Sequence, residues 1–140
     1  MKVEEQDLIH ALNGIKSVHD ADDLERLERF AQQLHEFGAS ETSINAFLSI
    51  FERFPVEDGF GVFWAILHGL EKLPGYESHL LQSLQRQPAE FSLRMVERII
   101  NSGGSQIDGI DLSTLLKSIA KDSKQAPNIR EYAQRIIEKP

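Results

Sequence analysis

The chain has 140 residues, a net charge of −7 and no cysteine. This length suits a single domain over residues 1–140, and the missing cysteines exclude thiol catalysis, disulfides and cysteine-based zinc sites. The N-terminus is acidic, and no run approaches the roughly 20 apolar residues of a spanning helix, so the sequence predicts a soluble, cytoplasmic protein without a membrane partner.

Amphipathic patterns predict three helices in the first third of the chain. Residues 4–18 place leucine and isoleucine on one face and predict the first helix. Asp20 is the expected N-cap of the second helix, which ends at Gly38. Ser40 or Thr42 caps the third. All three carry one apolar stripe and should pack through it.

Residues 58–75 predict a fourth helix, around which the others pack. Its apolar stripe is widened by Phe60 and Trp64, so we expect most of its surface to lie in the core. Gly69 lacks a side chain and allows a neighbouring helix to approach closely. Pro74 and Gly75 end the helix and turn the chain.

The second half predicts four more helices. The fifth begins near Tyr76, and the sixth opens with Pro88 at the favoured first position. Residues 101–109 form the one long loop, without helical periodicity. Asp111 caps the seventh helix, and Pro127 opens the eighth.

The predicted fold class is therefore all-α. About eight helices with short connections favour antiparallel hairpins stacked side by side as a HEAT-like α-solenoid, and a compact helical bundle is the alternative. No segment carries the alternating pattern of a strand.

Charge is divided unevenly along the chain. Residues 1–70 hold 5 basic and 13 acidic side chains, a net −8, whereas residues 71–140 hold 10 basic and 9 acidic ones, a net +1. An acidic field of this kind repels nucleic acids and attracts basic partners, although it also serves solubility. Both interpretations are open at this point.

Motifs for chemistry are missing from the sequence. The histidines lack the spacing of metal pairs, the glycine loop at 102–105 lacks a phosphate-binding lysine, and no serine sits in a nucleophile elbow. The lysines near 117–124 have no interleaved aromatic residues, which argues against nucleic-acid binding. We expect no catalytic, cofactor or metal site and no small-molecule substrate, the alternative being an enzyme of unfamiliar type centred on His68. By elimination, a protein-binding role is the class of function that these observations favour.

Four segments between residues 55 and 105 carry a resemblance to a known class. They are Asp58-Gly59-Phe60-Gly61-Val62-Phe63-Trp64-Ala65-Ile66-Leu67-His68-Gly69-Leu70-Glu71, Pro74-Gly75-Tyr76-Glu77, Arg86-Gln87-Pro88-Ala89-Glu90-Phe91 and Arg98-Ile99-Ile100-Asn101-Ser102-Gly103. Together they resemble small helical immunity proteins of bacterial contact-dependent growth inhibition and polymorphic-toxin systems. The resemblance implies an all-α, HEAT-like protein that binds and blocks one cognate toxin domain in the cytoplasm.

The toxins of such systems are often nucleases with basic grooves, so the resemblance also gives the acidic half a role as the partner-binding surface. Carboxylates would pair with the toxin's arginines and lysines. The expected partner-binding residues are Asp20, Asp22, Asp23, Glu57, Asp58, Glu71, Tyr76 and Glu77, the last five flanking the fourth helix. The alternatives are that these residues are ordinary caps and surface, and that the chain is a general helical-repeat adaptor for a protein or peptide.

Overall fold

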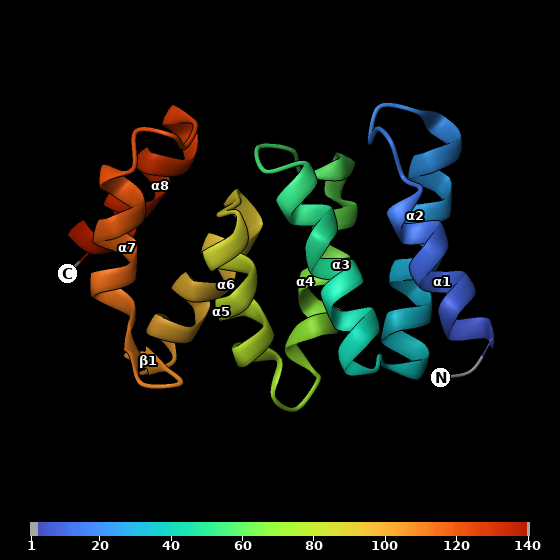
Figure 1. Cartoon of the computed structure of the whole chain (residues 1–140), viewed down its shortest axis with the longest axis horizontal. Helices are drawn as coiled ribbons and strands as arrows, with labels where there is room; N and C mark the ends of the chain where they lie inside the picture. Colours follow the sequence, from blue (N-terminus) through green and yellow to red (C-terminus); the bar gives the residue numbers. More distant parts are fainter. Residues whose placement is uncertain (1–2, 140) are drawn as a thin grey trace.

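The computed structural model describes residues 3–139, which contain eight α-helices, one 3₁₀ turn and two short strands (Figure 1). The elements are α1 (Val3–Asn13), α2 (Ala21–Phe37), α3 (Glu41–Arg53), η1 (Gly59–Gly61), α4 (Val62–Glu71), α5 (Tyr76–Arg86), α6 (Glu90–Asn101), β1 (Gln106–Ile107), β2 (Ile110–Asp111), α7 (Leu112–Lys121) and α8 (Pro127–Glu138). The all-α class predicted from the sequence is confirmed. The finer assignment to a repeat solenoid stays a prediction.

The helices form a row of four antiparallel hairpins, with α1 and α2 at one end and α7 and α8 at the other (Figure 1). Helices α1, α3 and α5 pack side by side in one layer, and α2, α4, α6 and α8 form the second, while α7 packs on α8. The connections after α1, α3, α5 and α7 therefore lie at one end of the helices, and those after α2, α4 and α6 lie at the other.

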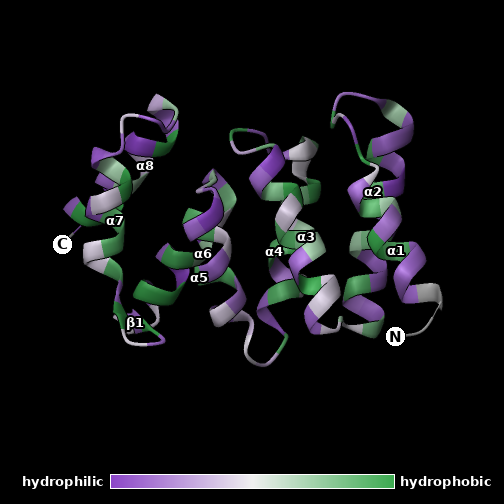
Figure 2. Ribbon diagram, viewed as in Figure 1, coloured by the Kyte–Doolittle hydropathy of each residue, from purple (hydrophilic) through white to green (hydrophobic). Residues whose placement is uncertain are grey.

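The core lies between the two layers, because each helix turns its apolar stripe toward the other layer. Figure 2 shows hydrophobic and hydrophilic residues on opposite sides of the helices. At the centre, the rings of Phe51 on α3, Phe63 on α4 and Phe91 on α6 lie 5.3–5.6 Å apart. All three are at most 2% exposed, so they join three helices into one core. No helix within residues 3–139 is long and apolar enough to cross a membrane.

The fourth predicted helix is shorter than expected and only partly in the core. The α-helical part runs from Val62 to Glu71, and the chain before it makes a 3₁₀ turn. Phe60 is 69% exposed and Trp64 37% exposed, so the prediction that both widen a buried stripe is wrong. The role of Gly69 is confirmed: a Cβ there would lie 2.7 Å from Leu34 Cδ2 on α2.

Two other boundaries differ from the sequence-based expectation. Helix α1 ends at Asn13 and not at residue 18, since the backbone N–H groups of residues 16 and 17 donate to a side chain instead of to helical carbonyls. Helix α6 begins at Glu90, because Ser92 Oγ accepts the N–H of Ala89 and caps the helix one residue after Pro88.

The long loop contains a strand pair that the sequence analysis did not predict. Gln106 pairs with Asp111 and Ile107 with Ile110, in an antiparallel register. Asp108 and Gly109 make the turn with φ of 50° and 80°, the positive values that a two-residue hairpin turn requires. Each strand has only two residues, too few for an alternating pattern, but the Asp-Gly dipeptide is the signal of such a turn.

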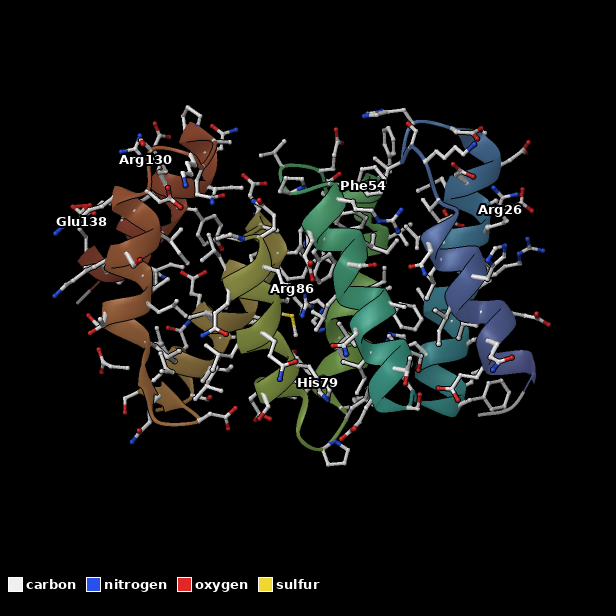
Figure 3. The ribbon with its side chains drawn as sticks, in the orientation of Figure 1. Arg26, Phe54, His79, Arg86, Arg130 and Glu138 are labelled. Carbon is white, nitrogen blue, oxygen red and sulfur yellow. The ribbon has the colours of Figure 1, made fainter. Side chains whose placement is uncertain are left out.

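Polar contacts tie neighbouring helices of one layer together. Figure 3 labels Arg86 and His79 on α5, both beside α3. Arg86 donates to both carboxylate oxygens of Glu52, at 3.1 and 2.9 Å, and His79 hydrogen-bonds Asn45 at 3.1 Å. On α3, the Arg53 guanidinium donates to backbone carbonyls at the C-terminal end of α1, where acceptors lack helical partners. These contacts join α3 to its two neighbours in the layer, α1 and α5.

Candidate partner-binding surfaces

Four of the predicted acidic residues lie together at one end of the helices. We call this group, formed by Asp20, Asp22, Glu57 and Asp58, the acidic end. Asp20 caps α2, and Glu57 and Asp58 follow α3 in the loop beside it. Two contacts hold the loops together: His19 Nε2 lies 3.1 Å from Glu57 Oε1, and the rings of His19 and Phe60 meet edge to face at 5.6 Å.

Phe60 is held out from the acidic end on an unusual backbone. Its φ and ψ of 52° and 39° are left-handed, and its glycine neighbours also have positive φ. Gly59 is required, since a Cβ there would lie 2.7 Å from the Phe63 ring. Asp58 Oδ1 accepts the Phe60 N–H at 3.0 Å and fixes the turn. Left-handed backbone costs a bulky residue free energy, and such strain concentrates at functional sites.

Asp23 was predicted with this group, but the structure gives it another role. Its side chain is 3% exposed and accepts hydrogen bonds from the N–H groups of Lys16 and Ser17 and from the Arg26 guanidinium. These bonds, that of Lys16 foremost, hold the pKa of Asp23 below its usual value. The carboxylate is engaged by three donors inside the chain and does not belong to the acidic end.

The remaining three predicted residues lie at the opposite end, around the connection between α4 and α5 (Figure 1). Glu71 accepts a hydrogen bond from Arg98 Nε at 2.7 Å, and its carboxylate is already paired. Burial, with Glu77 and Glu71 nearby, raises the pKa of Tyr76 to about 12. Tyr76, Glu71 and Arg98 line a shallow depression. The eight predicted residues therefore do not form one patch.

A third surface was missed by the sequence analysis. On the layer of even-numbered helices, Arg94 of α6 lies over the rings of Trp64, Phe91 and Tyr132, with its guanidinium carbon 5.2–5.3 Å from each centroid. His68 stacks on Trp64 at 5.9 Å. In the sequence, only the three-residue spacing of Phe91 and Arg94 and the four-residue spacing of Trp64 and His68 signal this cluster, since its members come from three helices, α4, α6 and α8.

His68 is exposed, and its Nδ1 lies 3.9 Å from Glu71 Oε1. Across residues 3–139, no three histidine, aspartate or glutamate side chains are grouped so as to hold a metal ion. The surfaces that stand out are thus an acidic end with a presented aromatic ring and an arginine–aromatic face.

Comparisons of the chain with protein-family models, with curated proteins and with solved structures each return no match.

Proposed function

We propose that this protein is an immunity protein, which binds a bacterial toxin domain with a basic surface in the cytoplasm and blocks it without catalysis of its own. The observation that carries the proposal is the acidic end: carboxylates from two successive loops surround a phenylalanine that is 69% exposed. The resemblance of residues 55–105 to helical immunity proteins supplies the particular class.

Electrostatics at the acidic end favour a basic partner. Asp20, Asp22 and Asp58 are exposed, and no ion pair within residues 3–139 neutralises them. Complementary charge speeds the encounter of two proteins and rejects partners of the same sign. The arginines and lysines with which a nuclease holds phosphates fit this surface.

Phe60 supplies the apolar contact that charge alone does not provide. Interface energy is concentrated in a few large side chains that become fully desolvated, surrounded by a polar rim. Phe60 meets this description, because its ring is exposed and the hydrogen bond from its N–H to Asp58 Oδ1 holds its backbone in the turn. Little ordering entropy is then lost when the ring enters a pocket on the partner.

The biological test is co-expression with the cognate toxin domain, which the proposal expects to be encoded immediately upstream. Cells that make both proteins should survive, and the purified proteins should form a complex. Cells that die as readily with this protein as without it would show that it is not an immunity protein. Capture of a housekeeping protein in place of a toxin would favour the adaptor alternative instead.

The surface is tested by a charge change with a matched control. Asp22→Lys with Asp58→Asn alters the net charge by three units and keeps an oxygen acceptor for the Phe60 N–H. Glu131→Lys with Glu138→Gln makes the same change on α8, where both glutamates are exposed. We expect the first pair to slow association by about 10-fold at low salt and to flatten its salt dependence. Equal slowing of association by both pairs of substitutions would show that the rate depends on the total net charge of the protein and not on the acidic end.

The aromatic contact is tested in the same complex. Phe60→Ala should weaken binding by about 2 kcal/mol or more, mainly through faster dissociation measured by surface plasmon resonance. Phe37→Ala is the control, since Phe37 is 81% exposed at the other end of the helices. A dissociation rate of the Phe60→Ala variant equal to that of the parent chain would show that Phe60 does not contact the partner.

A further inference from the structure

The arginine–aromatic face differs in chemistry from the acidic end. Arg94 is enclosed by rings from three helices: Trp64 of α4, Phe91 of its own helix and Tyr132 of α8. Arg135 of α8 lies over the same Tyr132 ring, at 5.3 Å from the centroid. Stacking on aromatic faces fixes the plane of a guanidinium and leaves its edge free for a bidentate acceptor.

Neither arginine has an acceptor among residues 3–139. Arg94 and Arg135 take part in none of the hydrogen bonds or ion pairs of the described chain, and Arg94 Nε is buried without a partner. Neighbouring basic residues do have carboxylate partners: Arg98 pairs with Glu71 and Lys139 pairs with Glu97, each with a nitrogen–oxygen distance of 2.7 Å. The two guanidinium groups thus lie beside one ring, and no carboxylate of the described residues is hydrogen-bonded to either.

The charges around the two arginines favour a small negatively charged group. A pocket between α6 and α8 is lined by Arg94, Arg135 and Lys139 and by two carboxylates, Glu90 and Glu97. Glu97 is already engaged, because it accepts from Lys139 and from the Tyr132 hydroxyl at 2.9 Å. Burial raises the pKa of Tyr132 to about 12, which keeps this hydroxyl protonated as the donor. A positive excess remains at the two arginines.

We propose that Arg94 and Arg135 bind an acidic segment of a partner protein, whose aspartate or glutamate carboxylates accept the hydrogen bonds that the two guanidinium groups lack. Trp64 is 37% exposed and Arg135 is also exposed, and tryptophan and arginine are enriched at the energetic centre of protein interfaces. A nucleic acid fits less well, because Glu90, Glu97 and a net charge of −7 repel a long polyanion. This surface is independent of the acidic end and of the function proposed above.

The single tryptophan makes the inference directly testable. Trp64 is the only tryptophan, is 37% exposed and lies against Arg94, so its fluorescence reports on this site. Titration of the full chain with a hexaglutamate peptide at low salt should give a saturable change in Trp64 emission, and hexaglutamine should give none. Arg94→Met and Arg135→Met should each weaken hexaglutamate binding by about 10-fold.

Arg98→Met is the matched control, because Arg98 lies on the same helix and is already paired with Glu71. Its affinity for hexaglutamate should equal that of the parent chain. Circular dichroism establishes that each variant is folded. If Arg94→Met does not fold, the hexaglutamate affinity of the Arg135→Met variant tests the proposal, because Arg135 is exposed.

Three results would overturn the proposal. The first is the absence of a saturable fluorescence change, and the second is unchanged affinity in the folded arginine variants. The third is binding of inorganic phosphate as tight as that of hexaglutamate, which would make the surface a general anion site. If co-expression gives no protection against the toxin but the hexaglutamate titrations behave as expected, the function proposed for the acidic end is wrong and the proposal for the arginine–aromatic face stands.

Discussion

Asp23 shows how one residue joins a turn to a helix. The N–H groups of Lys16 and Ser17 donate to its Oδ2 at 2.9 and 3.2 Å, and Arg26 adds a third hydrogen bond. The sequence identifies Asp20 as the cap of α2, and the structure confirms it. The role of Asp23 could not be predicted in the same way. The apolar periodicity of residues 4–18 predicted a helix where the structure has a turn, and this turn provides the N–H groups of Lys16 and Ser17.

The depressed pKa of Asp23 predicts a pH-dependent contribution to stability. A carboxyl whose folded pKa lies below its usual value of 3.8 stabilises the fold above that pH and loses this effect as the pH falls through the folded pKa. Asp23→Asn should lower the free energy of unfolding by about 1–3 kcal/mol at pH 7 and by clearly less at pH 3. Urea denaturation at both pH values measures this. An equal loss at both would assign the effect to packing and not to charge.

At the scale of elements, helix existence could be predicted and helix ends less well. The apolar period of 3.6 residues located all eight helices, because burial between two layers demands one apolar face from each. Phe60 was misplaced because an exposed phenylalanine in a turn has the same hydropathy as a core phenylalanine one helical turn away. Gly59 and Gly61 are the local sign of the break, since both adopt the positive φ that glycine allows.

The contact between α2 and α4 depends on Gly69. A Cβ at this position would lie 2.7 Å from Leu34 Cδ2 and 2.8 Å from Leu34 Cγ, and Leu34 is only 2% exposed. Alanine favours a helix over glycine by about 1 kcal/mol, whereas overpacking a core costs about 1–3 kcal/mol. We therefore expect Gly69→Ala to lower the free energy of unfolding by about 1 kcal/mol, as measured by urea denaturation.

A double variant separates this clash from other causes. Leu34→Ala creates a cavity in the parent chain, but with Gly69→Ala the new methyl group partly fills it. The loss in the double variant should therefore be smaller than the sum of the two single losses. Additive losses would show that the methyl group and Leu34 do not compete for the same space.

On the scale of the whole molecule, the fold class could be read from the sequence, but the surfaces could not. Five of the eight expected partner-binding residues were chosen as neighbours in sequence around one helix. A helix of ten residues spans about 15 Å, so Glu57 and Asp58 at its start lie far from Glu71 and Tyr76 at its end. Arg94, Trp64 and Tyr132 meet only because α4, α6 and α8 share a layer, which local periodicity does not encode.

The row of hairpins turns the charge asymmetry of the sequence into a spatial one. Residues 1–70 carry a net −8, and the described part of this half, residues 3–70, lies in α1 to α4 at one end of the row, apart from the nearly balanced second half (Figure 1). A hexalysine peptide should therefore shift backbone amide NMR signals mainly within α1 to α4. At 1 M salt the screening length falls to about 3 Å, and these shifts should disappear. Shifts spread evenly over α1 to α8 would contradict this, because a basic partner would then have no preferred end to approach.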